Sequence, residues 1–176
     1  YGGSCFPKDT LALIKTAQDY GTPSRIVETV AAVNDQRKRA MGRKVIAACG
    51  GSVRGKTIAV LGLTFKPNTD DMRDAPSIAI AQALADAGIA IAAHDPEGMD
   101  AAAPLMPQVT MMRDPYAAIA GADAVVIVTE WDAYRALDLA RVRQLVNTPL
   151  LVDLRNIYEP GEVRAAGLDY VSIGRS

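Results

Sequence analysis

One cysteine near the start of the chain stands in a setting that suits a nucleophile. Residues 1–9 read YGGSCFPKD, so that Cys5 follows two glycines and precedes a proline. Gly2 and Gly3 allow backbone angles that other residues avoid, and they leave room for a ligand to approach. Pro7 suits the first turn of a helix, which places Cys5 at or just before a helix N-terminus. The partial positive charge there favours the thiolate, so the segment indicates an exposed, activated thiol.

Two charged residues follow this cysteine. Lys8 would add to the positive potential that favours the thiolate. Asp9 lies one helical turn after Cys5, where a carboxylate can position or deprotonate a water at the same site. The alternative is a glycine-rich turn that caps a helix and holds a small buried cysteine, and these residues alone favour both interpretations equally. Because the chain begins within this motif, we expect it to be the C-terminal part of a longer protein.

Composition limits the class of protein. The 176 residues are 49% hydrophobic and carry 19 basic and 20 acidic side chains, which allows a core and argues against nucleic acid as a partner. The sequence has no apolar run that could span a bilayer and no visible signal peptide, so we predict no membrane partner and a cytoplasmic location. Cys5 and Cys49 do not make a disulfide framework, and Cys49 is expected in a core. Clusters of metal ligands are absent from the sequence, so no metal site is predicted.

The chain divides near residue 52, into a helical region at residues 1–52 and a second region at residues 53–176. A first helix is expected at about residues 8–20, and a second at residues 24–48 would be roughly 36 Å long. The second helix has an apolar stripe that includes Ile26, Val27, Val30, Val33, Met41, Val45 and Ile46, opposite a basic face with Arg37, Lys38, Arg39, Arg43 and Lys44. Such a stripe needs a partner, and we favour a homodimer interface over packing on the chain's own second half.

The second region alternates short apolar runs with helical segments. We expect strands at residues 56–62, 89–95, 109–112, 124–129, 150–153 and 170–173, and helices at residues 77–87, 118–122 and 137–146. This alternation is typical of an α/β fold with a doubly wound parallel sheet. Such sheets bind their ligands at the carboxyl ends of the strands.

The loop after the first strand is a candidate binding loop. Residues 62–73 read GLTFKPNTDDMR, which keeps only the first glycine of the G-x-G-x-x-G dinucleotide fingerprint. The loop is longer than an ordinary βα turn of about 2–6 residues. Lys66 and Arg73 are expected to hold phosphates, and Phe65 to cover a base or a sugar. The alternative is a solvated loop in which these charges pair with Asp70, Asp71 and Asp74.

Other strand ends carry side chains of interest. Arg155 follows the strand at residues 150–153 and is well placed to bind a carboxylate or phosphate. Glu130 and Trp131 follow the strand at residues 124–129, and a packing role is favoured for Trp131, the only tryptophan. His94, the only histidine, ends the second strand and is expected to make a local hydrogen bond rather than to catalyse.

Three motifs together resemble the nucleotide-sugar dehydrogenases, that is, the UDP-glucose/GDP-mannose dehydrogenase family. They are residues 2–9 (GGSCFPKD), residues 62–66 (GLTFK) with 70–73 (DDMR), and residues 153–156 (DLRN). The resemblance covers the whole chain, in the family's order. Residues 5–10 and 63–67 look most like the branch that oxidises UDP-glucose, although GDP-mannose and UDP-N-acetyl-hexosamine dehydrogenases share the architecture.

The resemblance implies a chemistry and a role for each matched residue. Members of the family oxidise a sugar C6 alcohol to a carboxylate with two NAD molecules, through a thiohemiacetal and a thioester on a cysteine that Cys5 matches. Asp9 matches an acid that assists water or proton handling. The other matched positions contact the cofactor at Lys8 and Arg73, and the substrate at Tyr1, Gly2, Phe65, Lys66 and Arg155.

The resemblance also implies the organisation of the chain. Residues 53–176 look like a Rossmann-like UDP-binding domain, and residues 24–48 look like a dimerisation helix. The family's NAD-binding domain and its upstream lysine and asparagine are not in the sequence, so we expect the chain alone not to turn over. Two other classes stay open: a non-catalytic UDP-sugar-binding and dimerising module, and a cysteine hydrolase that would need His94 as its base.

Overall fold

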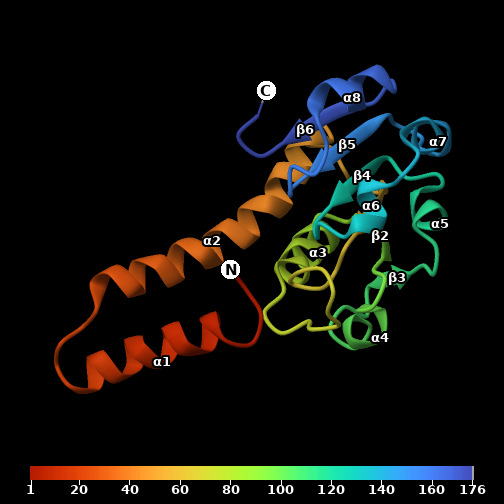
Figure 1. Ribbon diagram of the computed structural model, residues 1–176. Coiled ribbons are helices and arrows are strands. Elements are labelled where there is room, and N and C mark those ends of the chain that lie inside the picture. The colour runs from red at the N-terminus through yellow and green to blue at the C-terminus, as the bar shows by residue number, and fades with distance from the viewer. Residues whose placement is uncertain (176) are drawn as a thin grey trace.

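The computed structural model describes residues 1–175, which form a helical hairpin and an α/β body (Figure 1). The hairpin consists of α1 (Phe6–Asp19) and α2 (Arg25–Ala48). Pro7 lies in the first turn of α1, and Cys5 is the residue that caps this helix, which confirms the prediction from the sequence. The turn between the two helices contains Gly21, which adopts a positive φ of 71°.

The body is built on a parallel β-sheet. Its strands are β1 (Thr57–Leu61), β2 (Ala90–His94), β3 (Val109–Met111), β4 (Ala124–Ile127), β5 (Leu150–Asp153) and β6 (Asp169–Ser172). They pair in the order β3-β2-β1-β4-β5-β6 and every pair is parallel. This is the strand order of dinucleotide-binding sheets, in which the crevice for a ligand lies where the order reverses, between β1 and β4. The predicted α/β fold with a doubly wound parallel sheet is confirmed.

Helices cover both faces of the sheet. Two of them, α3 (Pro76–Asp86) and α7 (Leu139–Leu145), lie where the sequence predicted helices. A third, α5 (Pro115–Ile119), begins and ends three residues before the helix predicted at residues 118–122. The structure adds three short helices that the sequence analysis did not predict: α4 (Met99–Ala102), α6 (Asp132–Arg135) and α8 (Pro160–Ala165). Within residues 1–175, no helix combines the length and the apolar character needed to cross a bilayer.

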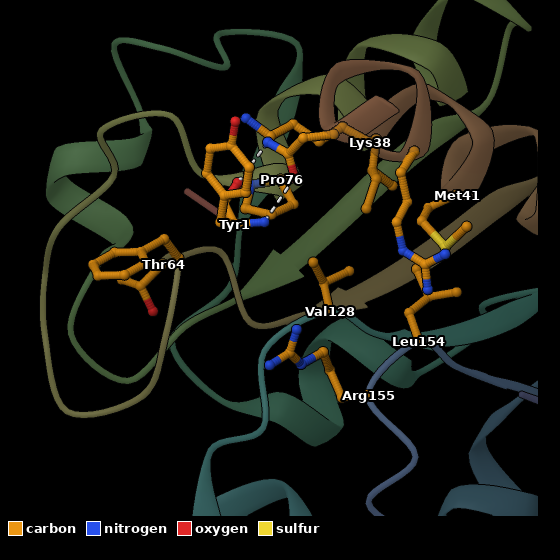
Figure 2. Close-up of a pocket in the computed structure, with 12 residues that line it drawn as sticks. Tyr1, Lys38, Met41, Thr64, Pro76, Val128, Leu154 and Arg155 are labelled. Atoms are coloured by element: carbon orange, nitrogen blue, oxygen red, sulfur yellow. Dashed lines mark hydrogen bonds between the residues drawn. The ribbon is translucent and has the colours of Figure 1, made fainter. Parts of the chain in front are cut away.

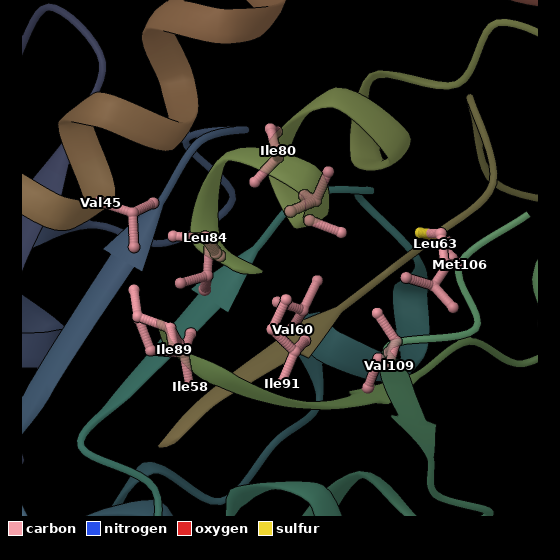
Figure 3. Packing of buried hydrophobic residues seen from close by; sticks show 14 of the residues in the cluster. Val45, Ile58, Val60, Leu63, Ile80, Leu84, Ile89, Ile91, Met106 and Val109 are labelled. Atoms are coloured by element: carbon pink, nitrogen blue, oxygen red, sulfur yellow. The ribbon is translucent and has the colours of Figure 1, made fainter. Parts of the chain in front are cut away.

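Alternate residues of the strands point into two separate cores. On one face, Ile58 of β1 packs with Val45 of α2 and Leu84 of α3, as Figure 3 shows. On the other face, Leu61 of β1 joins Val142 of α7 and its neighbours. Both faces are buried because parallel strands of this kind carry apolar residues on either side.

The long helix α2 lies in two environments. Its C-terminal half packs on the body, where Val45 is fully buried and Gly42 lies against Ala83 of α3. Its N-terminal half leaves Ile26, Val30 and Val33 exposed in the described chain. Packing on the chain's own second half, given above as the alternative, therefore accounts for one half of the apolar stripe only. Cys49, at the end of α2, is half-buried against the core, and this burial raises the pKa of its thiol.

Candidate functional site

Cys5 lies at the mouth of a cavity that the hairpin and the body share. The cavity has a volume of about 350 Å³. Its walls are Gly2, Ser4, Cys5, Phe6, Phe65, Lys66, Thr69 and Asp71. Cys5 is exposed, and its sulfur lies 3.6 Å from the hydroxyl of Ser4. The structure therefore brings residues from two separate motifs to one cavity, namely Cys5 from the first motif and Phe65 and Lys66 from the second.

Gly2 and Gly3 explain how the cysteine segment reaches the loop after β1. The N–H of Gly3 donates to the carbonyl of Arg73 over 2.9 Å. A Cβ on Gly3 would lie 2.7 Å from the ring of Phe65, and one on Gly2 would lie 2.5 Å from the carbonyl oxygen of Asp74. Only glycine permits such close contact, so the pair holds Cys5 opposite Phe65. This gives Gly2 a packing role, and its contact with a substrate stays a prediction.

Phe65 also lines a second cavity, of about 140 Å³, on its other side. The walls of this cavity are Tyr1, Asn34, Arg37, Lys38, Met41, Thr64, Phe65, Pro76, Ile80, Val128, Leu154 and Arg155. Figure 2 shows Val128, Leu154 and Arg155 on one side of it, and Tyr1 and Lys38 on the other. Apolar walls with a few cations suit a nucleoside and its phosphates. The predicted substrate residues Tyr1, Phe65 and Arg155 therefore meet at one place.

The segment after β5 holds Arg155 by means of a buried carboxylate. Asp153 is fully buried, and its oxygens accept hydrogen bonds from the N–H groups of Arg155 (3.0 Å) and Ile157 (2.8 Å). The hydroxyl of Tyr170, on β6, donates to the same carboxylate over 2.8 Å. Asn156 takes a positive φ of 56°, and its side-chain amide donates to the carbonyl of Ile173 over 2.9 Å. The hydrogen bonds to Asp153 and to Ile173 thus fix the backbone of this loop, and the Arg155 side chain lies at the cavity.

Arg155 and Glu130 form an ion pair across the ends of β5 and β4. One terminal nitrogen of Arg155 donates to Oε1 of Glu130 over 2.8 Å. Nε lies 2.6 Å from Oε2, as an ion-pair contact rather than an aligned hydrogen bond. The two side chains are 42% and 26% exposed, so solvent weakens the pair but does not remove its orienting effect.

The charges of the loop at residues 62–76 are mostly paired within the chain. Arg73 makes two 2.9 Å contacts to the carboxylate of Asp71, and the hydrogen bond from this guanidinium lowers the pKa of Asp71. Asp74 pairs with Lys38 of α2 over 2.6 Å. Lys66 extends over the ring of Phe65, 5.3 Å from its centre. The alternative of internal pairing is therefore confirmed for Arg73, which lies outside both cavities.

Lys8 and Asp9 lie on the exposed first turn of α1. Their side chains pair with each other over 3.3 Å and are 74% and 65% exposed. The N–H of Asp9 donates to the carbonyl of Cys5 over 2.9 Å, so the two residues are one turn apart as expected. Neither charged residue lines the cavity that contains Cys5, and their catalytic and cofactor roles stay predictions.

His94 is far less exposed than a general base of the cysteine would need to be. It is 7% exposed, and its Nδ1 lies 3.0 Å from the hydroxyl of Tyr134. Burial lowers the pKa of His94. It does not line the cavity of Cys5. The expected local hydrogen bond is confirmed, and a Cys–His hydrolase has no support from this geometry. Among residues 1–175 no group of three or more His, Cys, Asp or Glu side chains could hold a metal ion.

Several residues of the site were missed by sequence reasoning. Arg37 was assigned only to the basic face of a helix and Val128 only to a strand, while Thr64 and Leu154 lay within the quoted motifs but were given no role of their own. The signal that was available is their position, since Thr64, Val128 and Leu154 all lie at the carboxyl edge of the sheet.

Comparison with known proteins identifies the family of the two regions of the chain. Residues 59–160 match the UDP-glucose/GDP-mannose dehydrogenase family, UDP binding domain, and residues 1–36 match the central domain of the same family. The chain is 66% identical, over 175 residues, to a UDP-glucose 6-dehydrogenase of Rhizobium meliloti, and 42% identical to one of Pseudomonas aeruginosa. In both comparisons the alignment covers 99% of this chain and 40% of the relative, so the chain spans about 40% of the length of these proteins.

Solved structures of nucleotide-sugar dehydrogenases are also similar to this chain. A UDP-glucose dehydrogenase from Pyrobaculum islandicum superposes with a TM-score of 0.80 and 34% identity, covering 97% of this chain and 37% of that one. An NDP-N-acetyl-D-galactosaminuronic acid dehydrogenase from Methanosarcina mazei gives a TM-score of 0.84 and 25% identity, covering 100% of this chain and 38% of that one. Since the match to the family's UDP binding domain extends over more than half of the sequence, the chain belongs to the UDP-glucose/GDP-mannose dehydrogenase family.

Proposed function

We propose that this chain supplies the nucleophile and the nucleotide-sugar site of an NAD-dependent dehydrogenase that oxidises C6 of UDP-glucose in two steps. The observation that carries the proposal is the position of Phe65, which lines both the cavity of Cys5 and the cavity of Arg155. A ligand that spans the two cavities would put its phosphates near cations and its sugar near a thiol. The relatives named UDP-glucose 6-dehydrogenase support the choice of sugar.

Cys5 would act as a covalent catalyst at the aldehyde stage. Its thiolate adds to the C6 carbonyl carbon, the carbonyl oxygen takes a proton, and a thiohemiacetal results. C6 still carries one hydrogen, and its removal as hydride, with loss of the hydroxyl proton, leaves a thioester. Water then releases the carboxylic acid and restores the thiol, and Asp9 is the residue we assign to positioning that water.

NAD, when bound, would accept a hydride from C6 in each oxidation. The loop after β1 of this chain's own sheet lacks the dinucleotide fingerprint, since only its first glycine is present, and Gly62 packs closely on Thr129, where a Cβ would lie 2.5 Å away. Lys8 and Arg73 do fit, since their exposed cationic side chains (74% and 72% exposed) can meet the diphosphate of a cofactor that approaches from outside the body.

The remaining charged side chains would orient the substrate. Lys66 and Arg155 meet the diphosphate, and the Phe65 ring lies against the sugar or ribose. These contacts hold C6 near Cys5 and act before the chemical step, so they should contribute to substrate affinity more than to the rate of hydride removal.

A variant of Cys5 tests the covalent role. In a protein of the relatives' full length that carries this chain, Cys5→Ser should abolish the overall two-step oxidation of UDP-glucose, measured by NADH absorbance. Cys49→Ser is the matched control and should keep activity, because Cys49 packs on the core away from both cavities. Full double oxidation by Cys5→Ser would refute the proposal, and a panel with GDP-mannose and UDP-N-acetyl-hexosamines would identify the sugar.

A second candidate is a non-catalytic module that binds UDP-sugars and dimerises. It is favoured by one observation, the exposed apolar residues of the α1–α2 hairpin. Calorimetry of the chain with UDP tests the binding part, and no heat at millimolar UDP would count against an intact site.

A further inference from the structure

A buried hydrogen-bonded cluster joins the segments that follow β1, β2 and β4. Its centre is Asp95, directly after β2, whose side chain is fully buried. Oδ2 of Asp95 accepts hydrogen bonds from the N–H groups of Leu63 (2.6 Å) and Thr64 (3.1 Å) and from the Thr64 hydroxyl (3.2 Å). Oδ1 accepts from the N–H groups of Glu97 and Gly98. Asp95 makes no ion pair among residues 1–175, so hydrogen bonds alone compensate its buried charge.

Trp131 completes this cluster. Its indole Nε1–H lies 3.2 Å from Oδ2 of Asp95 and 3.3 Å from the Thr64 hydroxyl. The Thr129 hydroxyl donates to the carbonyl of Thr64 over 2.6 Å. Each polar atom of Thr64 is therefore bonded to a residue from the end of another strand, and the indole has a polar function as well as the packing role favoured from the sequence.

The cluster lies at the carboxyl edge of the sheet, where related sheets bind a cofactor. In dinucleotide-binding sheets with this strand order, an acid after the second strand binds the ribose of the cofactor. Here Asp95 follows β2 but is directed at the chain's own loop, and Thr64 and Trp131 occupy the space beside it. The carboxylate that the fold could offer to a ligand is used internally.

We propose that Trp131, through Asp95 and Thr64, is a positioning residue that sets Phe65 and Lys66 opposite Cys5. Thr64 immediately precedes Phe65, and the Phe65 ring packs so closely on Gly3 that a Cβ there would lie 2.7 Å from it. A small shift of Thr64 would therefore move the ring that separates the two cavities. The effect on ligand affinity rests on the UDP-sugar site proposed above, whereas the effect on the order of the loop does not.

Trp131→Phe removes one N–H donor and keeps an aromatic ring, and Thr64→Val removes the hydroxyl between the indole and the carboxylate. Loss of one such hydrogen bond should speed amide hydrogen exchange in residues 65–72 of the chain about three- to tenfold. The dissociation constant for UDP, measured by calorimetry, should rise by a similar factor of about three to ten. Thr64→Ser keeps the hydroxyl, and amide hydrogen exchange in residues 65–72 should therefore be as slow as in the parent.

Val142→Ala is the control for stability alone, since Val142 is fully buried in the other core. It should lower the melting temperature without a selective change in residues 65–72. The proposal is overturned if Trp131→Phe and Thr64→Val exchange in this loop no faster than Val142→Ala, or if Thr64→Ser behaves as Thr64→Val does. If the parent chain binds no UDP, the proposed function fails, and the exchange data still decide the positioning role.

Discussion

At the scale of single residues, Gly3 and Gly21 provide a natural comparison. Both adopt a positive φ, 79° and 71°, so an alanine at either position meets the same backbone strain. Their surroundings differ, because a Cβ on Gly3 would meet the Phe65 ring at 2.7 Å, whereas one on Gly21 meets no atom of residues 1–175 within 4 Å. The difference between the two variants therefore isolates the contact of the cysteine segment with Phe65.

We expect Gly21→Ala to lower the free energy of unfolding by about 1–2 kcal/mol, the cost of the left-handed conformation. Gly3→Ala should also displace Phe65 and weaken UDP binding about tenfold, since a bound group positioned by close packing tolerates little movement. Urea denaturation and calorimetry measure the two effects. Equal UDP affinities in the two variants would show that the contact does not matter for the site.

His94 gives the chain a dependence of stability on pH. Burial lowers the pKa of folded His94, so the unfolded chain binds a proton more readily. The stability that the neutral, buried His94 contributes is complete above the ordinary pKa of about 6.5 and is lost as the pH falls below that value. The free energy of unfolding then falls by at most about 1.4 kcal/mol per pH unit. His94→Gln should therefore show a smaller fall in unfolding free energy between pH 7 and pH 5 than the parent does. Identical slopes in parallel urea titrations would contradict this.

Sequence reasoning at this scale succeeded where partners are close in the chain. The position of Cys5 at a helix start follows from Pro7, and the pairing of Arg73 with Asp71 was foreseen as an alternative because the two are neighbours. The Arg155–Glu130 pair was not foreseen, since it depends on β4 and β5 being adjacent. Strand order is a property of the whole sheet and leaves no local signal.

At the scale of elements, α2 and α3 approach closely at Gly42. A Cβ on Gly42 would lie 2.6 Å from the Cβ of Ala83, so the backbone of α2 rests almost directly on α3. Glycine is a poor residue inside a helix, costing roughly 1 kcal/mol relative to alanine. Its presence in the middle of α2 is therefore explained by this contact.

Gly42→Ala should lower the free energy of unfolding by about 1–2 kcal/mol, because overpacking exceeds the gain in helix propensity. Adding Ala83→Gly should remove the clash, so that the double variant is more stable than the sum of the single changes predicts. A double-mutant cycle measured by thermal denaturation gives this coupling. Additive effects would mean that the helices separate easily at this point.

The elements themselves differ in how well the sequence predicts them. The strands were recognised because strands buried on both faces are continuous apolar runs, such as Ala124–Ile127. The helices α4 and α6 were missed because four residues are too few to show a helical period. The sequence did not predict that one half of α2 packs on the body while the other half is exposed. The apolar periodicity is the same along the whole helix, so it does not distinguish the two halves.

At the scale of the whole molecule, the hairpin projects from the body with apolar side chains in solvent (Figure 1). Within the described chain none of the 14 residues of α1 is buried, and Leu11 and Leu13 are 59% and 52% exposed. On α2, Ile26, Val30 and Val33 follow one helical face and are 81%, 47% and 55% exposed. This arrangement supports the proposed homodimer through α2.

Val33→Asp should weaken self-association about tenfold or more, because it would bury a charge in an apolar interface. Ala32→Asp is the control, since Ala32 is also exposed but lies on a different side of α2. Sedimentation velocity over a range of concentrations measures both. A monomeric parent chain, or equal dimerisation of both variants, would contradict the proposed interface.

The presence of Trp131 in the buried cluster has one more consequence. Because it is the only tryptophan of the chain, all indole fluorescence originates beside Asp95 and Thr64, one residue from Phe65. Emission wavelength and lifetime depend on the hydrogen bonding and polarity around that ring. The molecule thus contains its own optical reporter for the loop that faces Cys5, and occupancy of the site can be followed without a label.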